Sequence, residues 1–310
     1  MRDFFFKLGN RLGVSQPINR PAAQQVTAQV RTEHLSPSST TASTSFQIIS
    51  DTHLEAHKGY DTFPIIPKAP YLALLGDIGA VQPHKDEFAD FLLRQLEQFK
   101  IVFFVPGNHE PYGSNWGCVK DFLDHVVDLA RSRREQEPSL GQFVPLTRGR
   151  YDFDDDETKV SVLGCILYSN VPAPSMQQVS MFLNDFHVTE DWTVDEHNAQ
   201  HKADLNWLND QVASLEQSGR KIVIFTHHSP TTDERANNPR HAGSSVSSGF
   251  RTDLSKEKCW TSAQVKLWAF GHTHYNCDFV DEYGKRVYTN QRGYYFHEAD
   301  GYDGEGIVVV

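Results

Sequence analysis

Five short segments carry residue types that bind metal ions, and each directly follows a run of apolar residues. In chain order they are Asp51-Thr52-His53, Gly76-Asp77, Gly107-Asn108-His109-Glu110, Thr226-His227-His228 and Gly271-His272-Thr273-His274. Mixed carboxylate, amide and imidazole ligands suit Mn, Fe, Zn or Ni better than Ca or Mg. The segments hold more ligands than one ion needs, and two ions about 3.5–4 Å apart are a common arrangement for phosphoryl transfer. The sequence therefore predicts a dinuclear transition-metal site.

The apolar runs before these segments have the composition of buried strands. Strands are predicted at residues 46–50, 71–75, 101–105, 160–163, 221–225 and 265–270. Between them, apolar residues recur at helical spacing over residues 86–99, 119–133 and 199–217. This alternation predicts an α/β protein with a largely parallel sheet. Because parallel strands end at one edge, where α/β proteins bind ligands, we expect the five segments to meet there.

The pattern changes after residue 276. Strand-like runs at residues 277–280, 286–289 and 307–310 have no helix between them, and Asp281-Glu282-Tyr283-Gly284 is a typical hairpin turn. A second, mixed sheet is therefore expected. Two long stretches, residues 170–196 and 229–260, are predicted to be irregular. The second directly follows His228, so we expect it to contribute to function.

Taken together, the five segments resemble the calcineurin-like metallophosphoesterase superfamily, whose motifs are D-x-H, G-D, G-N-H-[DE], H and G-H-x-H. The resemblance covers residues 46–310, and Asn290-Gln291-Arg292-Gly293-Tyr294 is also similar to a segment of many small members. It implies an α/β fold, namely a four-layer α/β/β/α sandwich with two mixed β-sheets. It also implies a hydrolase of phosphoric esters with two divalent transition-metal ions as cofactors.

The resemblance implies a role for each matching residue. Seven side chains would bind the ions: Asp51, His53 and His274 the first, Asn108, His227 and His272 the second, and Asp77 both. A hydroxide formed from water between the ions would attack phosphorus. His109 would be the catalytic residue, because a protonated imidazole can donate to the departing oxygen. His228 matches no ligand position, and His228 and Arg292 are candidates for substrate binding.

Departures from the family's patterns narrow the substrate class. The Ser/Thr protein phosphatases of the superfamily carry G-D-x-x-D-R-G, whereas Asp77 is followed by Ile78-Gly79-Ala80-Val81. The Asp that orients the catalytic histidine in those enzymes is therefore missing, and the partner of His109 stays open. The metal-binding tyrosine of purple acid phosphatases is missing near this point as well. The remaining pattern resembles the small phosphodiesterase branch.

The favoured function is hydrolysis of a phosphodiester, in a small molecule or a nucleotide, by a metal-bound hydroxide. A broad-specificity phosphomonoesterase is the alternative. A non-catalytic interaction module on the same fold is a further one, although no ligand position has been lost. A nuclease is a third rival. The net charge of −11 argues against a nucleic-acid polymer as partner, because such proteins attract phosphates with surplus Lys and Arg.

Residues 1–45 contain much Ser, Thr and Gln, with five Lys/Arg and two acids, and they predict a disordered or targeting tail before a domain at residues 46–310. The predicted localisation is cytoplasmic, or mitochondrial if this tail is a transit peptide. The four cysteines lack C-x-x-C spacing, which favours reduced intracellular thiols. No apolar run is long enough to predict a membrane span. The oligomeric state is left open.

Overall fold

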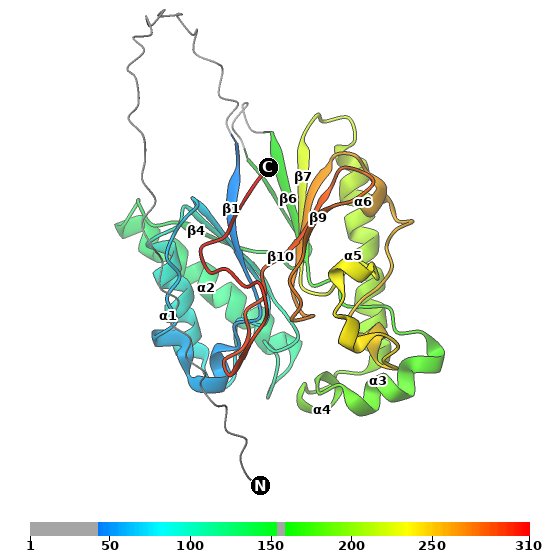
Figure 1. Cartoon of the computed structure of the whole chain (residues 1–310). Helices are drawn as coiled ribbons and strands as arrows, with labels where there is room; N and C mark the ends of the chain where they lie inside the picture. The colour runs from blue at the N-terminus through cyan, green and yellow to red at the C-terminus, as the bar shows by residue number, and fades with distance from the viewer. Residues whose placement is uncertain (1–42, 154–158) are drawn as a thin grey trace, which may run out of the picture. The chain divides into compact units, whose positions relative to one another are not determined.

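The computed structural model describes residues 43–153 and 159–310, and in this part of the chain two β-sheets pack face to face between two groups of helices (Figure 1). Residues 1–42 of the expected N-terminal tail lie outside the described residues. No helix within the described ranges is both long and apolar enough to cross a bilayer.

The first sheet has five strands in the order β13-β1-β2-β3-β4. Strands β1 to β4 are parallel, and β13 pairs antiparallel with β1. Their bounds are β1 (Ser45–Ile49), β2 (Tyr71–Leu75), β3 (Ile101–Val105), β4 (Gln142–Pro145) and β13 (Ile307–Val309). We expected the strand near residues 307–310 in the second sheet, and this expectation is wrong. It joins the first sheet because Val308 lies opposite Phe46 and is buried with it between the sheets.

The second sheet has six strands in the order β5-β6-β7-β8-β10-β9. Their bounds are β5 (Gly149–Asp152), β6 (Val160–Cys165), β7 (Lys221–Thr226), β8 (Val265–Phe270), β9 (Asp278–Val280) and β10 (Arg286–Thr289). Strands β6, β7, β8 and β10 are parallel, and the edge strands β5 and β9 run antiparallel to their neighbours. The predicted hairpin between β9 and β10 is confirmed. Gly284, with φ of 77°, donates its N–H to the carbonyl of Asp281 at 3.1 Å.

Side chains alternate along each strand, so each sheet contributes to two apolar layers. In β1, Phe46 and Ile48 face the other sheet, whereas Ile49 packs with the helices outside. Figure 1 shows α1 (Lys85–Leu96) and α2 (Trp116–Gln136) beside the first sheet, with α5 (Val194–Leu215) and α6 (Lys258–Thr261) beside the second. The buried clusters agree with this arrangement. The predicted four-layer α/β/β/α sandwich with two mixed β-sheets is therefore confirmed.

The stretch at residues 170–196 is more regular than we expected. It forms α3 (Met176–Phe182) and α4 (Asp185–Val188), and α5 already begins at Val194, where the Thr193 side chain accepts from Glu196 N. Both extra helices are short, so a repeating apolar stripe could not reveal them.

The stretch at residues 229–260 holds three 3₁₀ turns, at Glu234–Ala236, Pro239–His241 and Ser247–Gly249. The chain beyond β10 adds a small hairpin, β11 (Gly293–Tyr294) with β12 (His297–Glu298).

Candidate metal centre and active site

Five of the predicted metal ligands have a left-handed backbone, which residues other than glycine rarely adopt. The φ angle is 54° at Asp51, 47° at His53, 52° at Asp77, 72° at His272 and 48° at His274. Each conformation costs of order 1–3 kcal/mol and persists only where the surroundings hold it. Here hydrogen bonds join the strand ends: Asp51 N donates to Gly76 O, and His53 N donates to Asp77 O, both at 3.0 Å. The chain is thus turned sharply after β1, β2 and β8.

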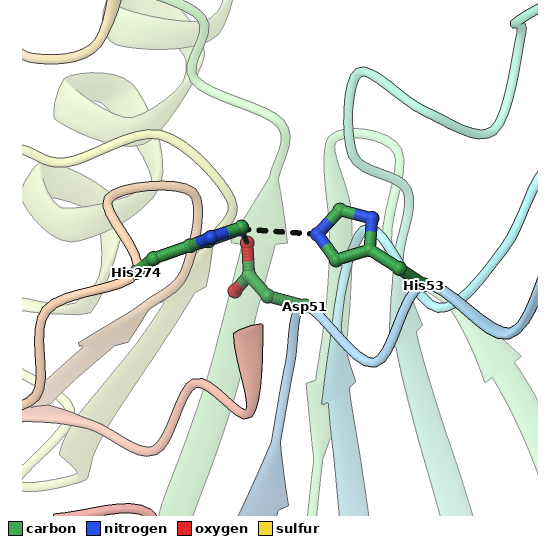
Figure 2. Close-up of side chains that lie close together, drawn as sticks. All are labelled: Asp51, His53 and His274. Carbon is green, nitrogen blue, oxygen red and sulfur yellow. Dashed lines mark hydrogen bonds and ion pairs between the residues drawn. The ribbon is translucent and has the colours of Figure 1, made fainter. Parts of the chain in front are cut away.

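Asp51, His53 and His274 form a first cluster. Figure 2 shows the three side chains converging, although His274 follows β8 and the other two follow β1. The Nε2 atoms of His53 and His274 are 3.0 Å apart, and His274 Nε2 is 3.4 Å from Asp51 Oδ1. Asp51 and His53 are buried, whereas His274 is half-buried. The cluster therefore gathers two imidazole nitrogens and a carboxylate around one point.

Asp77, His227 and His272 form a second cluster, and all three are buried. His227 Nε2 is 2.9 Å from Asn108 Oδ1 and 3.4 Å from Asp77 Oδ1. The other ring nitrogen, Nδ1, donates to the carbonyl of Leu75 at 2.9 Å. That bond leaves Nε2 as the nitrogen available to a ligand, which is the usual arrangement of a metal-binding histidine.

Asp77 lies between the two clusters. Its carboxylate is grouped with His227 and His272 on one side and with His53 and His109 on the other, with ligand atoms within 4.8 Å of one another in each group. The backbone N–H of His109 donates to Asp77 Oδ1 at 2.8 Å and fixes the carboxylate in this position. Asp77 is thus within reach of both clusters, and its bridging role stays a prediction.

The residues present fit bound cations. Nε2 of His272 is buried and has no hydrogen-bond partner among the described residues, and such an unpaired group costs about 1–3 kcal/mol. Burial lowers the pKa of His272 to about 3, so the ring is neutral, as a metal ligand must be. The Nε2 atoms of His53 and His274 also face each other. A cation bound to both nitrogens would satisfy them better than a hydrogen bond between the two rings.

His109 has a carboxylate partner that the sequence did not reveal. Glu55 lies in a short 3₁₀ helix, Leu54–His57, directly after the first ligand segment. Its Oε1 atom is 2.9 Å from His109 Nδ1 and 3.5 Å from His53 Nδ1. Tyr112 stacks on the His109 ring, with centroids 4.2 Å apart. One carboxylate and one aromatic ring therefore hold the orientation of this imidazole.

Glu110 links the ends of β2 and β3 through hydrogen bonds. It is fully buried and accepts N–H groups from Gly107 at 2.6 Å, Ile78 at 3.0 Å and Asp77 at 3.1 Å. Burial and the charge of Asp77 raise the pKa of Glu110 to about 8. The sequence showed this residue within the G-N-H-E segment, but nothing in the motif assigned it this role.

Asp185 is a second residue that sequence reasoning missed. Its Oδ1 atom accepts from Asn108 Nδ2 at 2.9 Å and from the Tyr112 hydroxyl at 2.5 Å. Because the amide nitrogen of Asn108 is held there, its oxygen faces His227. No motif marks Asp185, which begins α4 in the stretch we expected to be irregular.

A cavity of about 330 Å³ opens onto these clusters. The predicted site residues that line it are Asp77, Asn108, His109, His272 and His274. Tyr294 lines it as well and stacks on His53, with centroids 4.3 Å apart. Among the described residues that form its wall, none is Lys or Arg. The positive charge for a bound phosphoryl group must therefore come from the metal ions and from protonated histidine.

The two predicted substrate-binding residues lie outside this lining. His228 is fully buried 4.1 Å from the His272 ring, centroid to centroid, and burial holds its pKa well below the usual range. It packs against His272, and its role in substrate binding stays a prediction. The Nη1 atom of Arg292 donates to Thr52 O at 3.3 Å, and its guanidinium lies 5.1 Å from the centre of the Phe63 ring. Arg292 therefore braces the turn that carries the first ligands.

Two facing mixed sheets with candidate metal ligands gathered at the strand ends, together with the family match that follows, identify a metal-dependent phosphoric ester hydrolase. The chain belongs to the calcineurin-like phosphoesterase family, whose model matches residues 45–276. The uncharacterized protein L509 of Acanthamoeba polyphaga mimivirus is 27% identical over 248 residues, which span 75% of this chain and 81% of that protein. The crystal structure of the phosphopantetheinyl hydrolase from Mycobacterium tuberculosis has the same fold, with a TM-score of 0.56 and 17% identity over 82% of this chain and 91% of that chain.

Proposed function

We propose that the chain hydrolyses a phosphodiester of a small molecule or nucleotide at a two-metal centre. The observation that carries the proposal is the convergence of two ligand clusters around Asp77. The proposed ligands are Asp51, His53 and His274 for the first ion, Asn108, His227 and His272 for the second, and Asp77 for both. Mn, Fe, Zn or Ni would suit this mixture of imidazole, carboxylate and amide donors. These ions would activate a water molecule and neutralise phosphoryl oxygens.

His109 has the place of a proton donor in this proposal. Its Nδ1 is engaged by Glu55, whereas Nε2 lies 3.9 Å from Asp77 Oδ2 on the cavity side. A proton held on Nε2 would pass to the departing oxygen, and Glu55 would stabilise the charged ring before that transfer. Tyr294 and Tyr112 would flank the reacting group and exclude bulk water from it.

The charge of the cavity wall favours a diester over a monoester. A monoester is a dianion near neutral pH, and enzymes commonly bind its extra charge with an Arg or Lys. The described wall has neither, and it carries the carboxylate of Asp185. A diester with one negative charge needs less compensation. The broad-specificity phosphomonoesterase remains the second candidate, because two cations alone could also hold a dianion.

Matched chromogenic substrates test this proposal. The full chain, loaded with Mn²⁺, is assayed with bis(p-nitrophenyl) phosphate and with p-nitrophenyl phosphate. We expect kcat/KM to be at least about tenfold higher for the diester, a difference of about 1.4 kcal/mol in barrier. A reversed preference would establish the monoesterase instead. If neither substrate is hydrolysed with Mn, Fe, Zn or Ni, the function itself is contradicted.

A further inference from the structure

A second cavity, of about 220 Å³, adjoins the cavity of the metal centre. The two cavities share four lining residues, namely His241, Val246, Phe250 and Thr273. Phe250 also stacks on the proposed ligand His272, with centroids 4.9 Å apart. Complete small-molecule sites measure about 300–1,000 Å³, so the second cavity is large enough for only part of a ligand. The remainder of that ligand would lie at the metal centre.

Arg251 lines the second cavity and is half-buried. Within residues 43–153 and 159–310, its guanidinium has no carboxylate within 4.0 Å, and it makes one side-chain hydrogen bond, to Asn237 Oδ1. A guanidinium has five N–H donors, so most of them stay available. Burial lowers the pKa of Arg251, with no carboxylate to offset the loss of water. Arg235 in the same stretch differs, because it pairs with Asp233 at 2.6 Å.

The position of Arg251 is fixed by the strand end that also carries a proposed metal ligand. Ser229, two residues after His227, accepts the N–H of Thr252 at 3.1 Å and donates its own N–H to Phe250 O at 3.3 Å. Asn237, which receives the guanidinium, is itself buried and donates to Asp233 O at 2.6 Å. The arginine is thus held at a set place relative to the metal centre.

We propose that this second cavity binds a phosphate group of the substrate, so that the substrate is a phosphoester carrying a second, non-reacting phosphate. The inference rests on the proposed function and names its substrate class. Arg251 offers a bidentate fork to two phosphate oxygens, and Asn238, Ser244 and Ser247 line the same space with further polar groups. Binding of the remote phosphate would hold the reacting ester at the metal centre, where the wall itself has no fixed cation.

Two probes that differ only in one phosphate test the inference. They are p-nitrophenyl thymidine 5′-phosphate and the same diester with an added 3′-phosphate, assayed with the Mn²⁺-loaded full chain. We expect kcat/KM to be about tenfold higher for the 3′-phosphorylated probe. In Arg251→Gln this preference should disappear, and in Arg251→Lys, which keeps the charge but loses the fork, it should be partly kept. Arg240→Gln is the control, because Arg240 is an exposed arginine of the same stretch that does not line this cavity.

Calorimetric binding separates this inference from the proposed function. Thymidine 3′,5′-bisphosphate should bind the Mn²⁺-loaded protein about tenfold more tightly than thymidine 5′-phosphate, and Arg251→Gln should remove the difference. Tighter binding of the bisphosphate without any turnover would keep the phosphate site and contradict the hydrolase. Turnover of both probes at equal kcat/KM, with equal affinities for the two nucleotides, would overturn the phosphate site and leave the hydrolase intact.

Discussion

The Nδ1 atom of His109 lies 2.9 Å from Oε1 of Glu55. Glu55 thus supplies the carboxylate partner of His109 that the sequence left open, because Ala80 stands where the protein phosphatases have their orienting Asp. Burial opposes a charge on His109, but the charge of Asp77 and the hydrogen bond to Glu55 outweigh it and raise the pKa of His109 to about 9. Burial likewise opposes a charge on Glu55, yet hydrogen bonds to His109 and His53 lower the pKa of Glu55 to about 2. The pair is therefore an ionised carboxylate beside an imidazolium near neutral pH.

The variant Glu55→Gln should lose this support for the imidazolium. We expect kcat to fall about 10–100-fold, part of the about 10²–10⁴-fold that general acid catalysis contributes. Because Glu55 raises the pKa of His109, its removal should move the alkaline limb of the pH–rate profile to lower pH. Glu97→Gln, which alters an exposed carboxylate paired with Arg133, is the control. An unchanged alkaline limb would show that Glu55 does not act through His109.

The variant His109→Ala should lose rate but retain its metal ions. If His109 protonates the departing oxygen, the loss depends on the leaving group, and it should reach about 10²–10⁴-fold for a diester of phenol. The loss should be smaller for the p-nitrophenyl diester, whose leaving group needs little protonation. His125→Ala, on the exposed face of α2, should leave both rates unchanged. Loss of bound metal in His109→Ala would mean that the residue is a ligand instead.

Gly107→Ala should displace the groups that form the second cluster. A Cβ at this position would lie 2.3 Å from Asp77 Oδ1 and 2.7 Å from His227 Cε1, distances that no side chain tolerates. We expect activity and metal content to fall together, with the free energy of unfolding lowered by about 1–3 kcal/mol as in other overpacked sites. Gly304→Ala is the matched control, because its Cβ would meet nothing closer than 3.4 Å. Normal metal content in Gly107→Ala would contradict this packing.

The ligand segments could be predicted from the sequence because each one directly follows a buried strand. The strands before Asp51 and Asp77 pair in parallel, so their ends meet at one edge of the first sheet as expected. The expectation that one sheet carries all five segments is wrong, because the strands before His227 and His272 belong to the second sheet, which packs against the first. Within each segment, the spacing of the candidate ligands follows directly from the sequence. Topology thus determined most of the candidate site.

The remaining features depend on tertiary packing that leaves no local signal. Glu55 faces His109 from a short 3₁₀ helix that begins directly after the left-handed residue His53. Asp185 lies 77 residues after Asn108 in the chain. It contacts Asn108 from the short helix α4, which follows the short helix α3. The strand at Ile307–Val309 has three residues, too few for its pattern to select one sheet over the other.

Acid should destabilise the fold through His197, which is buried with its Nε2 accepting from Ser169 N at 3.0 Å. Burial, and to a smaller extent the charge of His201, lower the pKa of His197 to about 3. Between pH of about 6.5 and about 3 the unfolded chain therefore binds a proton that the folded chain does not, so stability falls as pH falls.

Urea unfolding of the metal-free protein measures this effect. Between pH of about 6.5 and about 4.5, the free energy of unfolding should drop by about 2 kcal/mol less in His197→Gln than in the wild type. His125→Gln, which alters an exposed histidine, should behave as the wild type does. Equal drops in His197→Gln and the wild type would show that His197 is protonated as readily in the folded state as in the unfolded state.

The most direct test counts metal ions in the wild type and in Asp77→Asn, by elemental analysis after Mn²⁺ loading and removal of free ion, alongside diester turnover. We predict two ions per wild-type chain. Asp77→Asn removes the charge shared by both clusters, so it should lose at least one ion and nearly all turnover, about 10³-fold or more. A wild-type chain that holds no tightly bound ion, or an Asp77→Asn variant with two ions and wild-type rates, would contradict the dinuclear centre.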